Sequence, residues 1–235
     1  MFSKIIATLI TLAITVVPAV MGQATESENA NGEPGALTVE MMVIRETSMA
    51  TNRGQNLLGL EYIEDAIGRG DAGDEVYAAL ERLVLAGSQN RVVLRGQVIN
   101  NFPDVRQEAA RQLGVLGTEE ARAVLLRATL VEREPMVLQE IINSLGAIDL
   151  EDNAQTISIV VWVASRFHRA PAPNNHVALA TVNALEQLAE RDGGLTYHHA
   201  FHYPFSVAEG PYVTFVRERA WEVIDGLRGS GDSEE

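Results

Sequence analysis

The chain of 235 residues contains no cysteine and, apart from Lys4, no lysine. Without cysteine it can form no disulfide bond and carry out no thiol chemistry. Only 6% of the residues are aromatic, whereas 46% are hydrophobic, which is enough for one domain of ordinary size or a short repeat array. Its stability must therefore come from packing alone.

Positive charge is scarce as well. The chain has 32 acidic and 18 basic residues, which gives a net charge of −14. An acidic surface repels nucleic acid and anionic lipid headgroups, so we expect neither as the main partner. The charge leaves a basic protein, a cation or a neutral glycan open as partner. Its simplest interpretation is that it keeps the protein soluble.

Catalytic signatures are missing too: there is no glycine-rich phosphate loop, no G-x-S-x-G and no C-x-x-C. The densest chemical cluster is residues 197–203, YHHAFHY. His198 and His202 are four residues apart, which on a helix places both imidazoles on one face, as a zinc site requires. Candidates for a third ligand are His199, Glu209 and His176. An amphipathic aromatic helix with half-buried histidines explains the same pattern, so we predict no catalytic residue, no metal and no cofactor, and keep metal binding as an alternative.

Residues 1–22 have the pattern of a secretory signal peptide. Lys4 supplies the positive charge, residues 5–17 are an uninterrupted run of apolar residues and threonine, and Pro18 ends it. The run is shorter than the roughly 20 apolar residues of a spanning helix, so we favour cleavage over a retained anchor. Because no cysteine follows the run, a lipoprotein is excluded. We expect a periplasmic or secreted protein without a membrane span after cleavage.

The rest of the chain divides by composition. Residues 23–36 and 229–235 are polar and rich in glycine, so we predict a disordered linker and a disordered acidic tail. Between them, residues 37–228 show apolar residues at helical spacing almost throughout. Residues 151–167 are apolar on nearly all sides, which predicts a central helix covered by both neighbours, with Trp162 in the core. Trp221, on the last expected helix, would mark a docking surface if it faces solvent.

Residues 103–148 contain one pattern twice, 32 residues apart. The matched pairs are Pro103 and Pro135, Val105 and Val137, Ala109 and Ile141, Leu113-Gly114 and Leu145-Gly146, and Leu116 and Ile148. The pattern returns at Val177, 40 residues after Val137, and at Val216, 111 residues after Val105. Self-similarity at such a period is typical of a solenoid, in which one unit cannot bury its apolar face alone. We expect about five helix pairs.

One long connection, residues 88–102, interrupts the helical spacing. Its valines and isoleucine and the Arg95-Gly96 pair could form a short β-hairpin, but we favour an extended segment packed along the array. A connection of this length inside a repeat array is often functional. Arg91, Arg95 and Asn101 could recognise a peptide or a glycan, although loop asparagines equally often bind local backbone groups.

The pattern P-x-V-R-x-x-A-A-x-x-L-G-x-L-G at 103–117, followed by T-E-E-A-x-x-x-L, resembles a HEAT repeat of the short bacterial type that also occurs in phycobilin-lyase subunits. Residues 135–148 keep the apolar positions but have Leu138 in place of the arginine, 175–190 match weakly, and 216–227 keep Val216, Arg217 and Ala220. The strings NNFPDVR, LGTEEA and EPMV also resemble those of exported bacterial HEAT-repeat proteins of unassigned function. The resemblance covers most of the chain after the signal peptide and says little about chemistry.

This resemblance implies an all-α fold, a right-handed α-α superhelix in which the second helix of each pair lines a concave, partner-binding surface. The expected inner helices are 54–68, 103–117, 135–148, 175–190 and 211–228. Arg106 and Arg217 match the inner-helix arginine of the family, which often bonds an acidic residue at the turn of a neighbouring unit. The resemblance therefore implies a structural ladder, with Asp104 and Glu134 as acceptors.

We predict a non-enzymatic scaffold or adaptor that binds a protein or envelope component through the concave face and the 88–102 connection. The expected contact residues are Arg91, Arg95, Asn101, Arg106, Gln107, Gln139, Asn143, Asn183 and Arg217. A lyase-like subunit is a further alternative by fold analogy alone. Export argues against it, because the phycobilin lyases act on cytoplasmic chromoproteins.

Overall fold

The computed structural model describes residues 38–169, 173–192 and 198–229. The predicted signal peptide, linker and acidic tail lie outside these ranges, apart from the first residue of the tail. The helices are α1 (Val39–Met49), α2 (Arg53–Gly68), α3 (Asp74–Val84), α4 (Pro103–Leu116), α5 (Glu119–Val131), α6 (Pro135–Ala147), α7 (Ala154–His168), α8 (Asn175–Arg191), α9 (His198–Ala208) and α10 (Thr214–Gly229). None of these described helices is long and apolar enough to cross a membrane.

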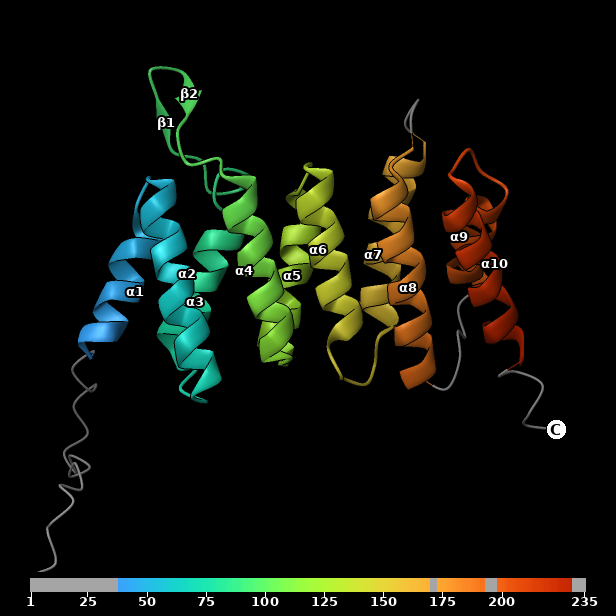
Figure 1. Ribbon diagram of the computed structural model, residues 1–235, viewed down its shortest axis with the longest axis horizontal. Helices are drawn as coiled ribbons and strands as arrows, with labels where there is room; N and C mark the ends of the chain where they lie inside the picture. Colours follow the sequence, from blue (N-terminus) through green and yellow to red (C-terminus); the bar gives the residue numbers. More distant parts are fainter. Residues whose placement is uncertain (1–37, 170–172, 193–197, 230–235) are drawn as a thin grey trace, which may run out of the picture. The chain divides into compact units, whose positions relative to one another are not determined.

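The helices pack in two layers (Figure 1). Each odd-numbered helix packs against the even-numbered helix that follows it, so the described residues form five helix pairs. The even-numbered helices also pack side by side in chain order, from α2 to α10, and the odd-numbered helices do the same from α1 to α9. The predicted all-α, HEAT-like solenoid is therefore confirmed, and the five expected inner helices form one layer.

Local signals explain where the helices begin and end. The side chains of Asn52, Thr118 and Asn174 cap α2, α5 and α8 by accepting hydrogen bonds from backbone N–H groups of the first turn. Pro103 and the register-equivalent Pro135 occupy the first positions of α4 and α6, where a missing N–H costs nothing. The last expected inner helix, 211–228, begins at Thr214 instead.

The repeated apolar positions form the core. Val105, Val137, Val177 and Val216, which occupy equivalent positions of α4, α6, α8 and α10, are all buried. The buried side chains form two clusters: one joins α1–α6 with one face of α7 and α8, and the other joins the remaining face of α7 and α8 with α9 and α10. The repeat pattern therefore marks the positions through which neighbouring units bury each other's apolar faces.

Two glycines at equivalent positions set the spacing within the even layer. A Cβ atom on Gly114 of α4 would lie 2.7 Å from the side chain of Ser144, and one on Gly146 of α6 would lie 2.9 Å from Cα of Ala184. Side chains at these positions would force the helices apart, because real Cβ atoms do not approach other atoms so closely. The repeated Leu-Gly dipeptide is thus a packing signal between adjacent even helices.

The 88–102 connection folds as a hairpin. β1 (Val93–Leu94) pairs antiparallel with β2 (Gln97–Val98), and the hairpin projects beyond the helix ends (Figure 1). Arg95 and Gly96 both have positive φ, 51° and 81°, as a two-residue turn that follows the strand twist requires. The favoured expectation of an extended segment packed along the array is therefore wrong.

The expectation that α7 lies in the centre with Trp162 in the core is also wrong. Trp162 is 57% exposed. α7 lies in the layer of odd-numbered helices, where it packs against α8 of its own pair and against α5 and α9. No described element covers its outer face. Trp221 is 41% exposed on α10, where its ring contacts Phe205 edge to face.

Candidate functional site

The even layer carries six of the predicted contact residues, one of which, Arg106 of α4, is buried. Gln107 lies on α4, Gln139 and Asn143 on α6, Asn183 on α8 and Arg217 on α10. Gln107 and Gln139 occupy equivalent positions of adjacent helices, because they are 32 residues apart. Asn143 lies one turn beyond Gln139 on the same helix face. We call the outward side of α4, α6 and α8 at these positions the even-helix surface.

Three amides on this surface are free. Gln107 and Gln139 are half-buried and Asn143 is exposed, and none of the three side chains has an intramolecular partner within the described part of the chain. Asn183 differs, because its Oδ1 accepts a hydrogen bond of 2.9 Å from Arg219 Nε, and Arg219 is also paired with Glu186. The free donors and acceptors of the even-helix surface therefore concentrate on α4 and α6.

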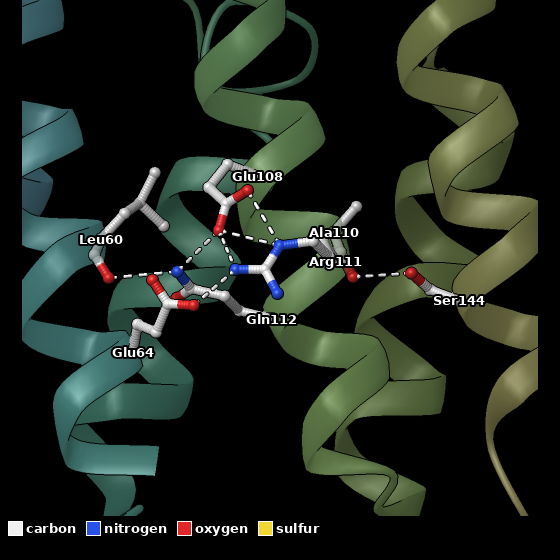
Figure 2. A network of polar contacts seen from close by, with 7 residues as sticks. All are labelled: Leu60, Glu64, Glu108, Ala110, Arg111, Gln112 and Ser144. Carbon is white, nitrogen blue, oxygen red and sulfur yellow. Dashed lines mark hydrogen bonds and ion pairs between the residues drawn. The ribbon is translucent and has the colours of Figure 1, made fainter. Parts of the chain in front are cut away.

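Beside these amides lies a polar network that sequence reasoning missed (Figure 2). Arg111 of α4 contacts Glu108 one turn earlier and Glu64 of α2, with its Nη2 3.0 Å from Glu64 Oε1. Gln112 Nε2 donates to the backbone carbonyl oxygen of Leu60 at 3.1 Å and to Glu108 Oε1 at 3.0 Å. The i, i+3 spacing of Glu108 and Arg111 signals this pair, but the bonds to α2 depend on which helices become neighbours.

The network fixes the charge of Glu108. Burial alone would raise the pKa of its carboxyl group, but hydrogen bonds from Arg111 and Gln112, together with the charge of Arg111, hold the pKa below its ordinary value. Glu108 therefore stays ionised and paired at neutral pH. Gln112 Oε1 is buried and accepts no hydrogen bond from any described residue. The network joins α2 to α4 and leaves the neighbouring amides of α4 and α6 open to a partner.

The predicted arginine ladder needs correction. Arg106 is 2% exposed and its Nε lies 2.7 Å from Oε2 of Glu132, which is equally buried; neither Asp104 nor Glu134 is its acceptor. Glu132 also accepts the backbone N–H groups of Arg133 and Glu134, at 2.7 and 2.8 Å. A buried arginine needs a carboxylate that is itself hydrogen-bonded, and Glu132 at the end of α5 satisfies this condition.

The other members of the predicted ladder lie elsewhere. Asp104, in the first turn of α4, forms an exposed ion pair with Arg53 of α2. Glu134 is exposed and forms no ion pair within the described ranges. Arg217 is exposed too and has no side-chain partner there. Because Arg106 reaches into the unit that follows it, Arg217 on α10 lacks an acceptor: no described helix comes after α10.

Arg106 is buried and so unavailable as the contact residue we expected, whereas Asn101 is exposed but its side-chain oxygen is already bonded to Arg106. Nη1 of Arg106 donates to Asn101 Oδ1 at 2.7 Å and to the carbonyl oxygen of Ala86 at 3.2 Å. Arg106 therefore joins the end of α3, the base of the hairpin and the end of α5, which is a structural role. Arg95 projects from the hairpin turn, exposed and without a partner among the residues that the structure covers.

Arg91 lines a groove of about 750 Å³ near the base of the hairpin. Its walls come from the end of α3, the turn between α5 and α6, and the end of α7. The lining residues are Gly87, Ser88, Arg91, Asn101, Arg106, Leu130, Val131, Glu132, Arg133, Glu134 and Arg166. We call it the arginine groove, because Arg91, Arg133 and Arg166 are exposed around it.

The described residues of the histidine segment form no metal site. The side chains of His198 and His199 lie outside the described part of the chain, and His202 and His176 are exposed. Among the described residues, no group of three or more metal-ligating side chains comes together. Tyr203, in contrast, is buried next to His168 and Tyr212, so the aromatic residues of this segment contribute to the second core cluster.

Comparison with known proteins supports the architecture. Residues 93–162, which span the hairpin, α4, α5, α6 and half of α7, match the family model for HEAT repeats. Searches of the curated proteins and of the solved structures found no match. Residues 93–162 are thus similar to HEAT repeats, and the helix pairs on either side of them continue the same two-layer array.

Proposed function

We propose that this protein is a non-enzymatic scaffold or adaptor that binds a protein partner through the even-helix surface. The observation that carries the proposal is the set of free amides on adjacent helices, Gln107, Gln139 and Asn143. HEAT repeats commonly mediate protein interactions, which is consistent with this role.

The chemistry of these side chains suits a polypeptide. Each carboxamide offers both a donor and an acceptor, which is the pairing that a peptide group needs. Because Gln107 and Gln139 repeat at the spacing of the helices, they could bind successive polar groups of one partner segment. Adjacent Arg111 is already paired with Glu108 and Glu64, so it positions the surface instead of offering a free charge.

We further propose that the protein acts in the periplasm. The support is the signal-peptide pattern of residues 1–22, with its positive charge at Lys4 and apolar run at 5–17. Expression of the full chain in a Gram-negative host, followed by osmotic-shock fractionation and intact-mass measurement, tests this. We expect a periplasmic product that has lost about 22 residues. A product that keeps Met1 and stays in the cytoplasm would disprove it.

The binding surface can be mapped by incorporating a photocrosslinking amino acid into the protein and irradiating the protein in the native cell envelope. Gln139 lies on the even-helix surface, whereas Gln155 of α7 is an exposed residue of the same type in the odd layer. We expect a discrete crosslinked partner from position 139 and none from position 155. The double variant Q139A/N143A, with the crosslinker at Gln107, should lose the product, while Q155A should keep it.

Equal crosslinking from positions 139 and 155 would contradict the proposal, since it would indicate unspecific contact. Loss of the product in Q139A/N143A counts only if its circular dichroism spectrum and thermal midpoint match those of Q155A. Both substitutions remove surface amides, so a change in fold is not expected.

A further inference from the structure

We propose that the arginine groove binds an acidic peptide segment, with Arg91, Arg133 and Arg166 pairing with its carboxylates. The groove uses different side chains from the even-helix surface, so the two proposals can fail separately. The inference rests on three features of the groove: free cationic side chains in a strongly acidic protein, a backbone or side-chain contact that holds each of them, and a volume suited to a peptide.

The three arginines have no carboxylate partner although acids are in excess. Nine arginines of the described residues form ion pairs. Seven further arginines, whose side chains the structure also describes, form no ion pair: Arg45, Arg91, Arg95, Arg133, Arg166, Arg169 and Arg217. Three of these seven line one groove. Since Arg106 and Glu132 neutralise each other in its wall, Glu134 is the only remaining acidic lining residue, and the groove keeps a positive charge.

Each arginine is held in place by a neighbour. The buried side chain of Asn100 holds the backbone on both sides of Arg91: its Nδ2 donates to the carbonyl oxygen of Asn90 at 2.7 Å, and its Oδ1 accepts from the N–H of Val92 at 2.9 Å. The N–H of Arg133 donates to Glu132, which Arg106 fixes. A ligand therefore meets cations on an ordered backbone, which reduces the entropy lost on binding.

Arg166 is oriented through its own side chain. Its guanidinium carbon lies 5.4 Å from the centroid of the Trp162 ring. A cation–π contact occupies none of the guanidinium N–H groups through a hydrogen-bond acceptor, so these donors stay available for a carboxylate. This contact also gives a role to the exposed Trp162, which the packing of α7 does not explain.

The size and lining of the groove favour a peptide. Its volume of about 750 Å³ is that of a site for a sizeable ligand and exceeds what an inorganic anion needs. Leu130, which is 46% exposed, and Val131 add apolar contacts that an inorganic anion could not use. A nucleic acid would bring a dense row of phosphates against a chain of net charge −14, whereas a few carboxylates match three arginines.

Fluorescence anisotropy with a labelled probe tests the proposal on the purified chain. The probe is a Gly/Ser peptide that carries three glutamates, and the matched control peptide carries glutamines at the same positions. We expect saturable binding of the glutamate peptide only, weakening as salt is raised. R133Q/R166Q should weaken it by at least about tenfold, since two charge-assisted pairs are lost. R45Q/R217Q, which removes the same charge from exposed, unpaired arginines elsewhere, should stay within about twofold of the wild type.

Several results would overturn the proposal. They are equal affinity for the glutamine peptide, an equal loss in R45Q/R217Q, and no saturable binding of the glutamate peptide at millimolar protein. Inorganic phosphate that displaces the probe at micromolar concentration would reassign the groove to a small anion. A single-stranded oligonucleotide that binds more tightly than the glutamate peptide would reassign it to nucleic acid.

Discussion

Arg106 illustrates how much one buried charge can matter in a protein without disulfides. It is 2% exposed and bonded to Glu132, Asn101 and the carbonyl oxygen of Ala86. Replacing it with methionine would leave Glu132 buried without its cationic partner. We expect R106M to lower the free energy of unfolding by about 3–5 kcal/mol, measured by urea denaturation.

The matched control for this prediction is the exposed pair between Arg53 and Asp104, whose side chains are 57% and 41% exposed. Since exposed pairs contribute little, R53M should lower the free energy of unfolding by no more than about 1 kcal/mol. If R106M and R53M lowered stability equally, the buried pair would not be the structural centre that its geometry indicates.

Glu108 should contribute to the loss of folding stability at acidic pH. Its folded-state pKa is lowered, so its ionised form stabilises the fold above the ordinary glutamate pKa of about 4.3, and that stabilisation disappears as the pH falls through the lowered value. We expect E108Q to lower the urea midpoint at neutral pH, with a smaller difference from wild type at about pH 3. E64Q, in the exposed part of the same network, is the control; a pH-independent effect of E108Q would contradict the assignment.

At the scale of helices, the Leu-Gly repeat makes a sharp prediction. A methyl group on Gly146 would meet Ala184 of α8 at 2.9 Å, whereas one on Gly226 of α10 would meet nothing within 4 Å. We expect G146A to lower the free energy of unfolding by about 1–3 kcal/mol through overpacking. G226A should be neutral or stabilising by up to about 1 kcal/mol, because alanine favours the helix. The thermal midpoints of both variants test this, and a stable G146A would show that α6 and α8 can separate at no cost.

The helices and their pairing could be predicted because they follow from short-range patterns, the 32-residue register and the prolines at helix starts. The Arg95-Gly96 pair only allowed the hairpin, and the extended segment that we favoured is wrong. Side-chain partners could not be predicted. Glu134 was expected to accept from Arg106, but Glu132 does so, since a difference of two residues at a helix end is invisible to the repeat pattern. Arg91 was predicted as a contact residue, but its grouping with Arg133 and Arg166 was not, because this grouping needs the ends of α3, α5 and α7 to meet.

At the scale of the whole array, α7 and α8 lie between two cores. Val160 and Val163 of α7 belong to the first buried cluster, whereas Ile157 and Ala164 belong to the second. α8 divides its buried face in the same way. Since each unit contacts only its neighbours, stability in such arrays is a sum of local terms. The two clusters should therefore lose stability separately.

Hydrogen exchange on the full chain can show this separation. Ile224 is a fully buried member of the second cluster, on α10, and Leu80 is a fully buried member of the first, on α3. We expect I224A, which creates a cavity of about 2–5 kcal/mol cost, to accelerate amide exchange in α8, α9 and α10 and to leave α1–α4 unchanged. L80A should do the reverse. Uniform acceleration along the chain in either variant would show that the array unfolds as one cooperative unit, in which case α7 and α8 transmit instability between the clusters instead of dividing them.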